Sequence, residues 1–484
     1  MAYYLGVDQG SHSSRAVMFD KNGDVVGTAV QQVALDRGED GRVEQDCNEL
    51  LDSVRTVIRQ VLSGLDRQQL QQVQACGIAT QRSTALAWDH DGHALGPALS
   101  WQDVRAREQL DELRPYETEI RRLTGLPLSA YYSATKLGWL LHQQPGIAKC
   151  DPAELRLSPL ISYLLFHLLK SRPYMTDYAN AQRTQLFDLD LLDWSERLCS
   201  LYGIERRLLP TCVPMCAHHG TLLDTQIPVT AVCGDQNAAI FGGGNPGPDV
   251  AQVNIGSGAF VLRKLERLSA SGTQLTGIAF ADSQAVSYMR EATINGAGNA
   301  LSWASEQWQL DHLQQQLPGW LLQVEQPPVF INTIGGLGTP WMRDDIPSSF
   351  VTEADYSDAE KAVAVIESIV FMIQLNIELM QAEAPLQGLE ASGGLSQLDG
   401  LCQKLSNLSG LVLERSDVIE ATARGVAWLA AGRPDAWNLA DDGVVTCGEC
   451  FTPQPDQPLH ERYQIFKTHI QRLTGQDPQG GAES

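Results

Sequence analysis

Residues 5–20 read LGVDQGSHSSRAVMFD, and this stretch decides the fold. An apolar run, Leu5 to Val7, ends in the carboxylate of Asp8, and a second apolar run begins after Arg15. Two such runs around a short turn of glycine and serine predict a β-hairpin. The turn offers N–H groups, hydroxyls and a guanidinium that suit a phosphate, and a strand-end carboxylate suits a metal ion. An ordinary serine-rich hairpin is the alternative interpretation of this segment taken alone.

The second half of the chain repeats this plan. Residues 251–262 read AQVNIGSGAFVL, two apolar runs around a Gly-Ser-Gly turn. Just before it, the apolar run Val229–Cys233 leads to Asp235, and a third run over 389–396 ends in a glycine pair. Two hairpins in different halves, with a glycine turn for a nucleoside, indicate two similar domains that bind one nucleotide. The sequence contains no G-x-x-x-x-G-K-[ST] motif, so it is not a P-loop protein.

The composition bounds the class of protein. With 484 residues, 43% of them hydrophobic and 19% charged, the chain is expected to form at least two globular domains. A net charge of −23 argues against nucleic acid or an anionic membrane as a partner, and it requires phosphate binding by local groups. The N-terminus shows no signal peptide, and ten cysteines scattered among apolar neighbours favour a reducing, cytoplasmic location.

The periodicity of apolar residues predicts the order of the elements. The stretch Gly242–Pro248 reads GGGNPGP and suits a hinge between domains. We therefore expect domains over 1–245 and 246–432, followed by a polar extension over 433–484 with a disordered end. The expected helices cover 48–65, 160–169, 359–380 and 420–431, and polar residues within 359–380 argue against a membrane span.

Longer motifs then carry a resemblance to a known family. They occur in order from Tyr4 to Gly432 and include DQGSHSSRA, TQRSTALAWD (80–89), SAYYSATKLGWLL (129–141), GDQNAA (234–239), GAGNALSW (296–303) and EATARGVAWLAAG (420–432). In these motifs the chain resembles the FGGY family of carbohydrate kinases, and within it the glycerol kinases most closely. Each motif is weak alone, but their order and spacing are specific.

The resemblance implies an α/β fold of two actin-like (ribonuclease H-like) ATPase domains, with mixed β-sheets flanked by helices and an active site in the interdomain cleft. It implies an enzyme that uses ATP and Mg²⁺ and transfers the γ-phosphoryl group to a hydroxyl of a small polyol or sugar. The expected partner is thus a small molecule, with no nucleic acid and no membrane, and a homodimer is left open.

The resemblance also assigns roles to residues. Asp235 is expected to be the catalytic base, although an aspartate that caps the following helix would occupy the same position. Asp8 is expected to hold Mg²⁺. The expected substrate-binding residues are Arg82, Ser83, Trp101, Tyr131, Asp235 and Gln236, of which Trp101 and Tyr131 could instead be core aromatics. The expected nucleotide-binding residues are Ser11, His12, Ser13, Arg15, Gly256, Ser257, Gly298, Gly393 and Gly394.

Three positions depart from the family pattern. Ser83 replaces a glutamate, and Ser302 and Leu398 replace a glutamine and an asparagine near the nucleotide. A serine cannot accept the two strong hydrogen bonds that a carboxylate accepts from vicinal hydroxyls, so affinity for glycerol should fall about ten- to a hundredfold. The smaller side chain leaves room for a four- or five-carbon polyol or a ketose.

Two further hypotheses remain open at this point. A non-catalytic sugar- or nucleotide-sensing protein could keep the same binding residues, but it would not require Asp8 and Asp235. An actin- or Hsp70-like ATPase shares the domain plan, but it would not need the group of Arg82, Trp101 and Tyr131.

Overall fold

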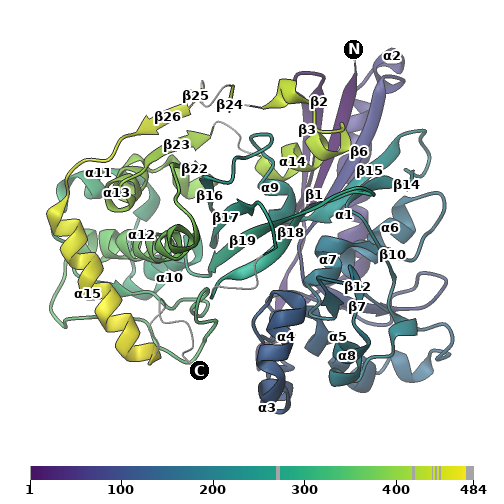
Figure 1. Ribbon diagram of the computed structural model, residues 1–484, viewed down its shortest axis with the longest axis horizontal. Coiled ribbons are helices and arrows are strands. Elements are labelled where there is room, and N and C mark those ends of the chain that lie inside the picture. The colour runs from purple at the N-terminus through teal and green to yellow at the C-terminus, as the bar shows by residue number, and fades with distance from the viewer. Residues whose placement is uncertain are drawn as a thin grey trace. The chain divides into compact units, whose positions relative to one another are not determined.

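The computed structural model describes residues 2–268, 273–416, 420–438, 440–441, 444–445 and 448–475. The chain divides by its contacts into two compact units, and neither is continuous in sequence. Unit 1 consists of Met1–Asn245, Gly277–Tyr288 and Glu420–Asp442, and unit 2 of Pro246–Thr276, Met289–Ile419 and Gly443–Ser484. Residues 420–432, which the sequence assigns to the second domain, therefore pack in unit 1 (Figure 1).

Unit 1 is built on a mixed six-stranded sheet. The hairpin predicted from residues 5–20 is confirmed: β1 and β2 pair antiparallel, with Asp8 opposite Arg15. The parallel strands β6 and β15 follow on the other side of β1, and β14 pairs antiparallel with β15 at the edge. The order is β14 (Cys216–Thr221), β15 (Pro228–Gly234), β6 (Val73–Thr80), β1 (Tyr3–Gln9), β2 (Ser13–Asp20), β3 (Val25–Gln32).

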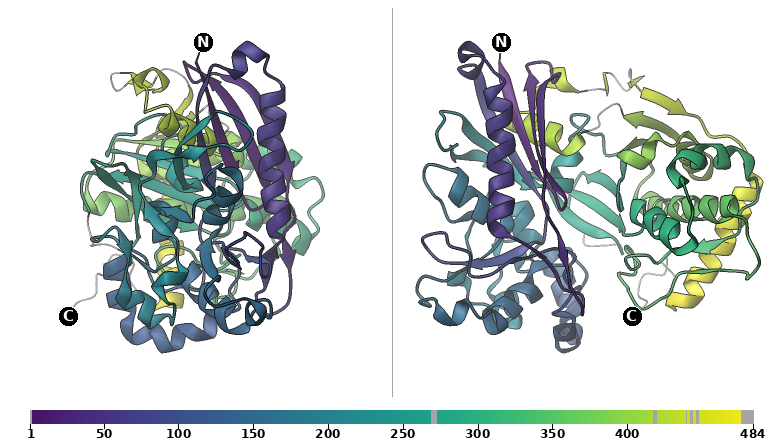
Figure 2. Two further views of the ribbon diagram at one scale, coloured as in Figure 1. Left: turned by 90° about the vertical axis from the view of Figure 1, so that its right-hand side faces the viewer. Right: turned by 180° about the vertical axis from the view of Figure 1, so that it is seen from behind.

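Helices cover both faces of this sheet. Helix α1 (Cys47–Ser63) begins at the N-cap Asp46 and packs its apolar face against β2 and β3, along the strands in Figure 2. Leu5 and Val7 share the core of α1, whereas Gly6 between them faces α14 (Ala421–Ala430). Because successive residues of a strand point to opposite faces, α1 and α14 lie on opposite sides of the sheet.

Three glycines let backbones meet at α14. A Cβ on Gly6 would lie 2.1 Å from the carbonyl oxygen of Ala423, and one on Gly77 would lie 2.2 Å from that of Val426. On the helix itself, a Cβ on Gly425 would lie 1.9 Å from the carbonyl oxygen of Ala238 in α9 (Asp235–Ala239). Only glycine fits these contacts, so α14 rests directly on the sheet and on α9.

The remaining elements of unit 1 form a second, five-stranded sheet and short helices. The sheet has the order β4 (Asp36–Arg37), β5 (Val43–Gln45), β8 (Ala98–Leu99), β7 (Ala85–Trp88), β9 (Arg156–Pro159), and two strand pairs are β10 (Met175–Asp177) with β13 (Thr211–Val213) and β11 (Phe187–Asp188) with β12 (Asp193–Trp194). The helices are α2 (Arg67–Leu70), α3 (Leu110–Leu113), α4 (Glu117–Thr124), α5 (Ser133–Gln143), α6 (Leu160–Leu168), α7 (Tyr178–Gln182) and α8 (Glu196–Leu201).

A seven-stranded sheet, which belongs to unit 2 except for residues 277–288 of β18 and β19, repeats the plan of the first sheet. Strands β16 and β17 form an antiparallel hairpin, β16, β22 and β23 are parallel neighbours, and β26 pairs antiparallel at the edge. The order is β18 (Leu275–Ala281), β19 (Val286–Ile294), β17 (Ala259–Leu265), β16 (Val250–Ile255), β22 (Gly388–Ser392), β23 (Val412–Ser416), β26 (Gly448–Phe451). Two mixed sheets of one plan, flanked by helices, agree with the predicted α/β class.

Helix α12 (Asp358–Glu383) lies at the centre of unit 2. A capping box between Ser357 and Glu360 fixes its start. Of the described helices, it alone is long and apolar enough to cross a membrane, and 89% of its most apolar window is buried within the fold. The neighbouring elements are α10 (Gly298–Trp308), α11 (Leu313–Gln323), α13 (Asp399–Ser409), α15 (Gln457–Thr474), and the strand pair β20 (Phe330–Ile331) with β21 (Ser349–Phe350).

The extension that the sequence predicts beyond residue 432 contains part of this core. Helix α15 buries Leu459, Tyr463, Phe466 and Ile470, and Figure 1 shows it beside α12 and α13. The spacing of these four apolar residues is that of a helix face, but the sequence analysis predicts no helix here. The polar tail over 476–484 lies outside the described residues.

A buried ion triad ties three helices of unit 2 together. Glu367 of α12, only 1% exposed, accepts two hydrogen bonds of 2.7 Å from Arg462 of α15 and one of 2.8 Å from Lys404 of α13. Such a cluster is favourable only while every charge keeps its partner.

Replacement of Gly77 by alanine should destabilise unit 1, because the new Cβ must displace the backbone of α14. We expect a loss of about 3 kcal/mol, which lowers the thermal midpoint by about 6–12 °C in calorimetry. The control is Gly27→Ala in β3, where a Cβ meets no atom within 4 Å. Equal midpoints for the two variants would contradict the close approach.

Glu367→Gln should lower the stability of unit 2 by about 3–5 kcal/mol in urea titrations, because Arg462 and Lys404 then stay buried without a carboxylate. Glu378→Gln serves as the matched control: it lies on the same helix and pairs with Lys467 of α15 at 2.7 Å, but it is 24% exposed. The control should cost about 1 kcal/mol or less. A Glu367 variant as stable as this control would show that the triad does not hold α15.

Candidate functional site

The first group of site residues lies at the end of β1. Asp8 is half-buried, and its Oδ1 atom is inaccessible and accepts no hydrogen bond from the described residues. The pKa of Asp8 is raised to about 7, mainly by burial and then by the charge of Asp235; the charge of Arg15 lowers it and that of Glu420 raises it. Arg15 donates to Glu420 at 2.7 Å, so the predicted phosphate-binding guanidinium has a carboxylate partner in this structure.

The turn between β1 and β2 presents the other predicted phosphate-binding residues. Its ends are closed by a hydrogen bond from the N–H of Gly10 to the carbonyl of Ser13. His12 is exposed, and the hydroxyl of Ser11 accepts a hydrogen bond of 2.9 Å from the indole N–H of Trp101. The structure therefore joins a residue predicted for the nucleotide to one predicted for the acceptor substrate.

Arg82 and Asp235 form the central ion pair of unit 1. Arg82 follows β6 and is 9% exposed; its Nε lies 3.2 Å from Oδ1 of Asp235, and its Nη1 donates to Asn237 at 3.2 Å. A Cβ on Gly234 would lie 2.5 Å from the Arg82 side chain, so the glycine before Asp235 makes room for the pair. Asp235 keeps 27% of its side chain exposed.

Asp235 also has a local structural role. It is the first residue of α9, and its Oδ1 accepts a hydrogen bond of 2.7 Å from the N–H of Gln236. Gly234, not Asp235, is the N-cap residue of α9, and no side-chain hydrogen bond caps this helix, so the helix-capping alternative does not describe Asp235. The contacts with Arg82 and with the N–H of Gln236 together hold Oδ1 of Asp235 in place. Within the part of the chain that is described, the side-chain oxygen of Gln236 is buried without a hydrogen-bond partner.

Ser83 is already engaged. It is buried and has a left-handed backbone, φ +64°, and its hydroxyl donates a hydrogen bond of 3.0 Å to the carbonyl of Arg183. Its proton is therefore committed to the fold, and only its lone pairs remain for a ligand. Sequence reasoning anticipated the loss of the carboxylate but not this internal bond.

Tyr131 and Trp101 lie together, with ring centroids 6.3 Å apart. The backbone around Tyr131 is held by Lys136, a fully buried lysine of α5 that sequence reasoning missed. Its Nζ donates to the carbonyls of Ala130, Tyr131 and Tyr132 at 3.0, 2.7 and 3.1 Å. Burial lowers the pKa of Lys136 to about 7, against the charge of Asp103. The signal was present, since Lys136 lies within the motif of residues 129–141.

A network of glutamines underlies these groups and was also missed. Gln81 Nε2 donates to Oε1 of Gln45 at 2.8 Å and to Oε1 of Gln9 at 3.2 Å. The hydroxyls of Thr84 and Ser11 donate to Oε1 of Gln81 at 3.0 and 3.4 Å. This buried network fixes the strand ends that carry Asp8 and Arg82.

In unit 2, a cavity of about 910 Å³ collects most of the predicted nucleotide-binding glycines. Gly256, Ser257, Gly298 and Gly394 line it, and so do the two departures, Ser302 and Leu398. Gly393 is not among the lining residues: it has φ +91°, and a Cβ there would lie 2.7 Å from the carbonyl oxygen of Ile255, so it serves the close packing against β16.

The start of α10 is bonded to the β16–β17 turn. The N–H groups of Gly298 and Asn299 donate to the carbonyls of Gly256 and Ser257, each at 2.9 Å. These donors are therefore satisfied within the protein, and α10 does not present them as an anion site.

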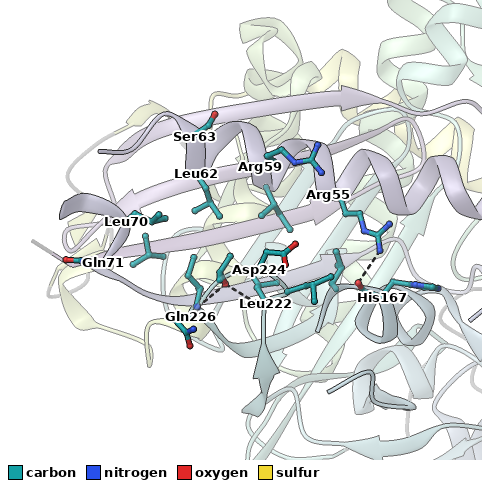
Figure 3. Close-up of a pocket in the computed structure, with 16 residues that line it drawn as sticks. Arg55, Arg59, Leu62, Ser63, Leu70, Gln71, His167, Leu222, Asp224 and Gln226 are labelled. Carbon is teal, nitrogen blue, oxygen red and sulfur yellow. Dashed lines mark hydrogen bonds between the residues drawn. The ribbon is translucent and has the colours of Figure 1, made fainter. Parts of the chain in front are cut away.

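Another cavity, about 960 Å³, lies in unit 1 (Figure 3). Its walls come from α1 and from the turn between β14 and β15, with Arg55 and Arg59 on the first and Asp224 on the second. Among its described lining residues is none that the sequence predicts for the site.

Comparisons with known proteins match two consecutive parts of the chain. Residues 3–242 match the N-terminal domain, and residues 251–432 the C-terminal domain, of the FGGY family of carbohydrate kinases. The chain is 32% identical to a glycerol kinase from Halorhodospira halophila, covering 97% of this chain and 96% of that protein. It is also 32% identical to one from Alcanivorax borkumensis, covering 98% of each.

Solved structures share the fold. A glycerol kinase from Plasmodium falciparum with ADP superposes with a TM-score of 0.83 at 22% identity, over 99% of both chains. A ligand-bound xylulose kinase from Lactobacillus acidophilus also gives 0.83, at 18% identity over 98% of this chain and 99% of that one. The predicted fold of two actin-like domains is thereby confirmed. Both family domains match in order and the relatives align over nearly the whole length, so the chain belongs to the FGGY family of carbohydrate kinases, phosphotransferases that act on an alcohol group.

Proposed function

We propose that this kinase transfers the γ-phosphoryl group of ATP to a hydroxyl of a small polyol or sugar, with Asp235 as the catalytic base. One observation carries the proposal: a partly exposed carboxylate is held by a buried arginine at the carboxyl end of β15. A carboxylate fixed in this way can accept the proton of a hydroxyl as the new P–O bond forms. Arg82 orients this carboxylate.

The acceptor alcohol would lie among the residues that unit 1 gathers. Trp101 and Tyr131 offer apolar ring surface, while Arg82 and Gln236 offer polar groups. The unsatisfied oxygen of Gln236 supports contact with a substrate hydroxyl, since a buried acceptor without a donor is costly. Because Ser83 cannot replace the two strong hydrogen bonds that a carboxylate accepts, and because its small side chain leaves room, we propose a four- or five-carbon polyol or a ketose, with glycerol as the weaker alternative.

The residues present also fit Mg²⁺. The inaccessible Oδ1 of Asp8 lacks a donor, and Asp235 is close enough for its charge to raise the pKa of Asp8. One or two carboxylates, completed by phosphate oxygens and water, are the usual ligands of this ion. Bound there, the ion would neutralise phosphate charge. Ser11, His12, Ser13 and Arg15 would contact phosphate from unit 1, and the 910 Å³ cavity would hold the nucleoside in unit 2.

A cytoplasmic location is part of the proposal. All nine cysteines among the described residues are free thiols. Cys450 is exposed, and its sequence neighbour Cys447 lies outside the described residues.

Asp235→Asn should abolish phosphorylation, by about 10³-fold or more, because an amide cannot accept the proton. The assay is coupled ADP release, screened first with the natural chain over polyols, aldoses and ketoses. Asp282→Asn is the control: Asp282 is 24% exposed and pairs with Arg433, away from the site residues, and its variant should keep full activity. Unchanged turnover in Asp235→Asn would defeat the assignment. Nucleotide binding without turnover on any acceptor would favour the sensing alternative.

Asp8→Asn should stabilise the metal-free protein at high pH. The folded carboxyl has a raised pKa of about 7, so its ionisation penalises the folded state increasingly as pH rises from about 4 to 7. The asparagine avoids this penalty. We expect a thermal midpoint higher than that of the natural chain by at least about 2–4 °C at pH 8, and a difference that vanishes near pH 4. A gain independent of pH would show that Asp8 is not held in a costly site.

A further inference from the structure

The 910 Å³ cavity of unit 2 has a floor of leucines. Leu301, Leu313 and Leu317 are 7%, 5% and 2% exposed, and Leu395 and Leu398 are half-buried beside them. These side chains come from α10, α11 and the segment before α13. A flat aromatic ligand that enters the cavity therefore finds apolar side chains to pack against.

Of the three serines that line the cavity, Ser257 lies in the β16–β17 turn, and the hydroxyls of Ser302 and Ser305 already donate within the protein. Ser302 donates to the carbonyl of Gly298 at 3.2 Å, and Ser305 donates to that of Leu310 at 3.1 Å. Each can still accept a hydrogen bond, but neither can donate to a ring nitrogen of a base without breaking its own bond. Adenine and guanine both present an N7 acceptor, so these serines do not separate them through it.

Side chains with other donors occupy the rim. Gln314, Gln315, Gln397 and His312 line the cavity but are all exposed to solvent. A hydrogen bond at an exposed position replaces one to water and contributes little to selectivity, whereas large discrimination requires a buried polar group that the wrong ligand leaves unpaired.

Leu398 shows that this position serves apolar contact. It is the N-cap residue of α13, where serine, threonine, aspartate and asparagine are preferred, and no side-chain bond caps the helix. A leucine here gives up about 1 kcal/mol of capping. What it provides instead is half-buried apolar surface on the cavity wall.

We infer that the cavity binds purine nucleotides by apolar contact and shape, with little discrimination between adenine and guanine. The inference rests on the proposed function, since it concerns the phosphoryl donor of that reaction. An apolar wall distinguishes ligands mainly by contact area, and adenine and guanine have similar area. Both ATP and GTP would then serve as donors.

The test is isothermal titration calorimetry of the full chain with Mg²⁺ and ADP, GDP or CDP, which needs no acceptor. We expect dissociation constants for ADP and GDP within tenfold of each other, and weaker binding of CDP, whose ring is smaller. A tenfold or larger preference for either purine overturns the inference but leaves the kinase proposal standing. Failure of every diphosphate to bind overturns both.

Leu398→Asn sharpens the test. The amide introduces a donor and an acceptor on the cavity wall, so the ratio of the ADP and GDP dissociation constants should change at least about fivefold. The variant should fold, because asparagine is a good N-cap. Leu322→Asn on α11, where the leucine is 85% exposed, is the control and should leave both constants unchanged. An unchanged ratio in Leu398→Asn also counts against the inference.

Discussion

The contact of α14 with the sheet is the constraint on which unit 1 depends. Backbone lies against backbone at Gly6 and Gly77, and Gly425 brings α9 equally close to the same helix. Since Asp235 begins α9 and Glu420 immediately precedes α14, these contacts fix two of the carboxylates around Asp8. The geometry of the proposed site is therefore set by positions where no side chain can be tolerated.

The charged side chains of unit 1 bear on how an acidic protein can bind an anionic substrate. Arg15 and Arg82 are its two site guanidiniums, and each already has a carboxylate partner, Glu420 or Asp235. Together with Asp8, these two ion pairs have a net charge that is zero or slightly negative. They therefore do not attract phosphate by themselves. A divalent cation at Asp8, as proposed above, would supply the missing positive charge, which accords with the orphan oxygen of this residue.

The sequence predicted what short-range periodicity encodes. The hairpin of β1 and β2 and the helices α1, α6, α12 and α14 lie within a few residues of the predicted ranges, because apolar spacing and caps mark them locally. The lysine that holds Tyr131 and the left-handed backbone of Ser83 were not predictable in this way. Each depends on chain segments that meet only in the folded protein. The family resemblance indicated which residues matter, but not that Arg15 would pair with Glu420 or that Gly393 would serve packing.

Both units combine segments that lie far apart in the sequence, and this affects how the chain folds during translation. The strands β1, β6 and β15 are synthesised within the first 234 residues, but the helix that covers their glycine-lined face comes only at residues 421–430. In unit 2, likewise, Glu367 gains its arginine partner only after Arg462 has been synthesised. Neither half can reach its final state during most of translation, so nascent chains must carry uncovered apolar surface until synthesis is nearly complete.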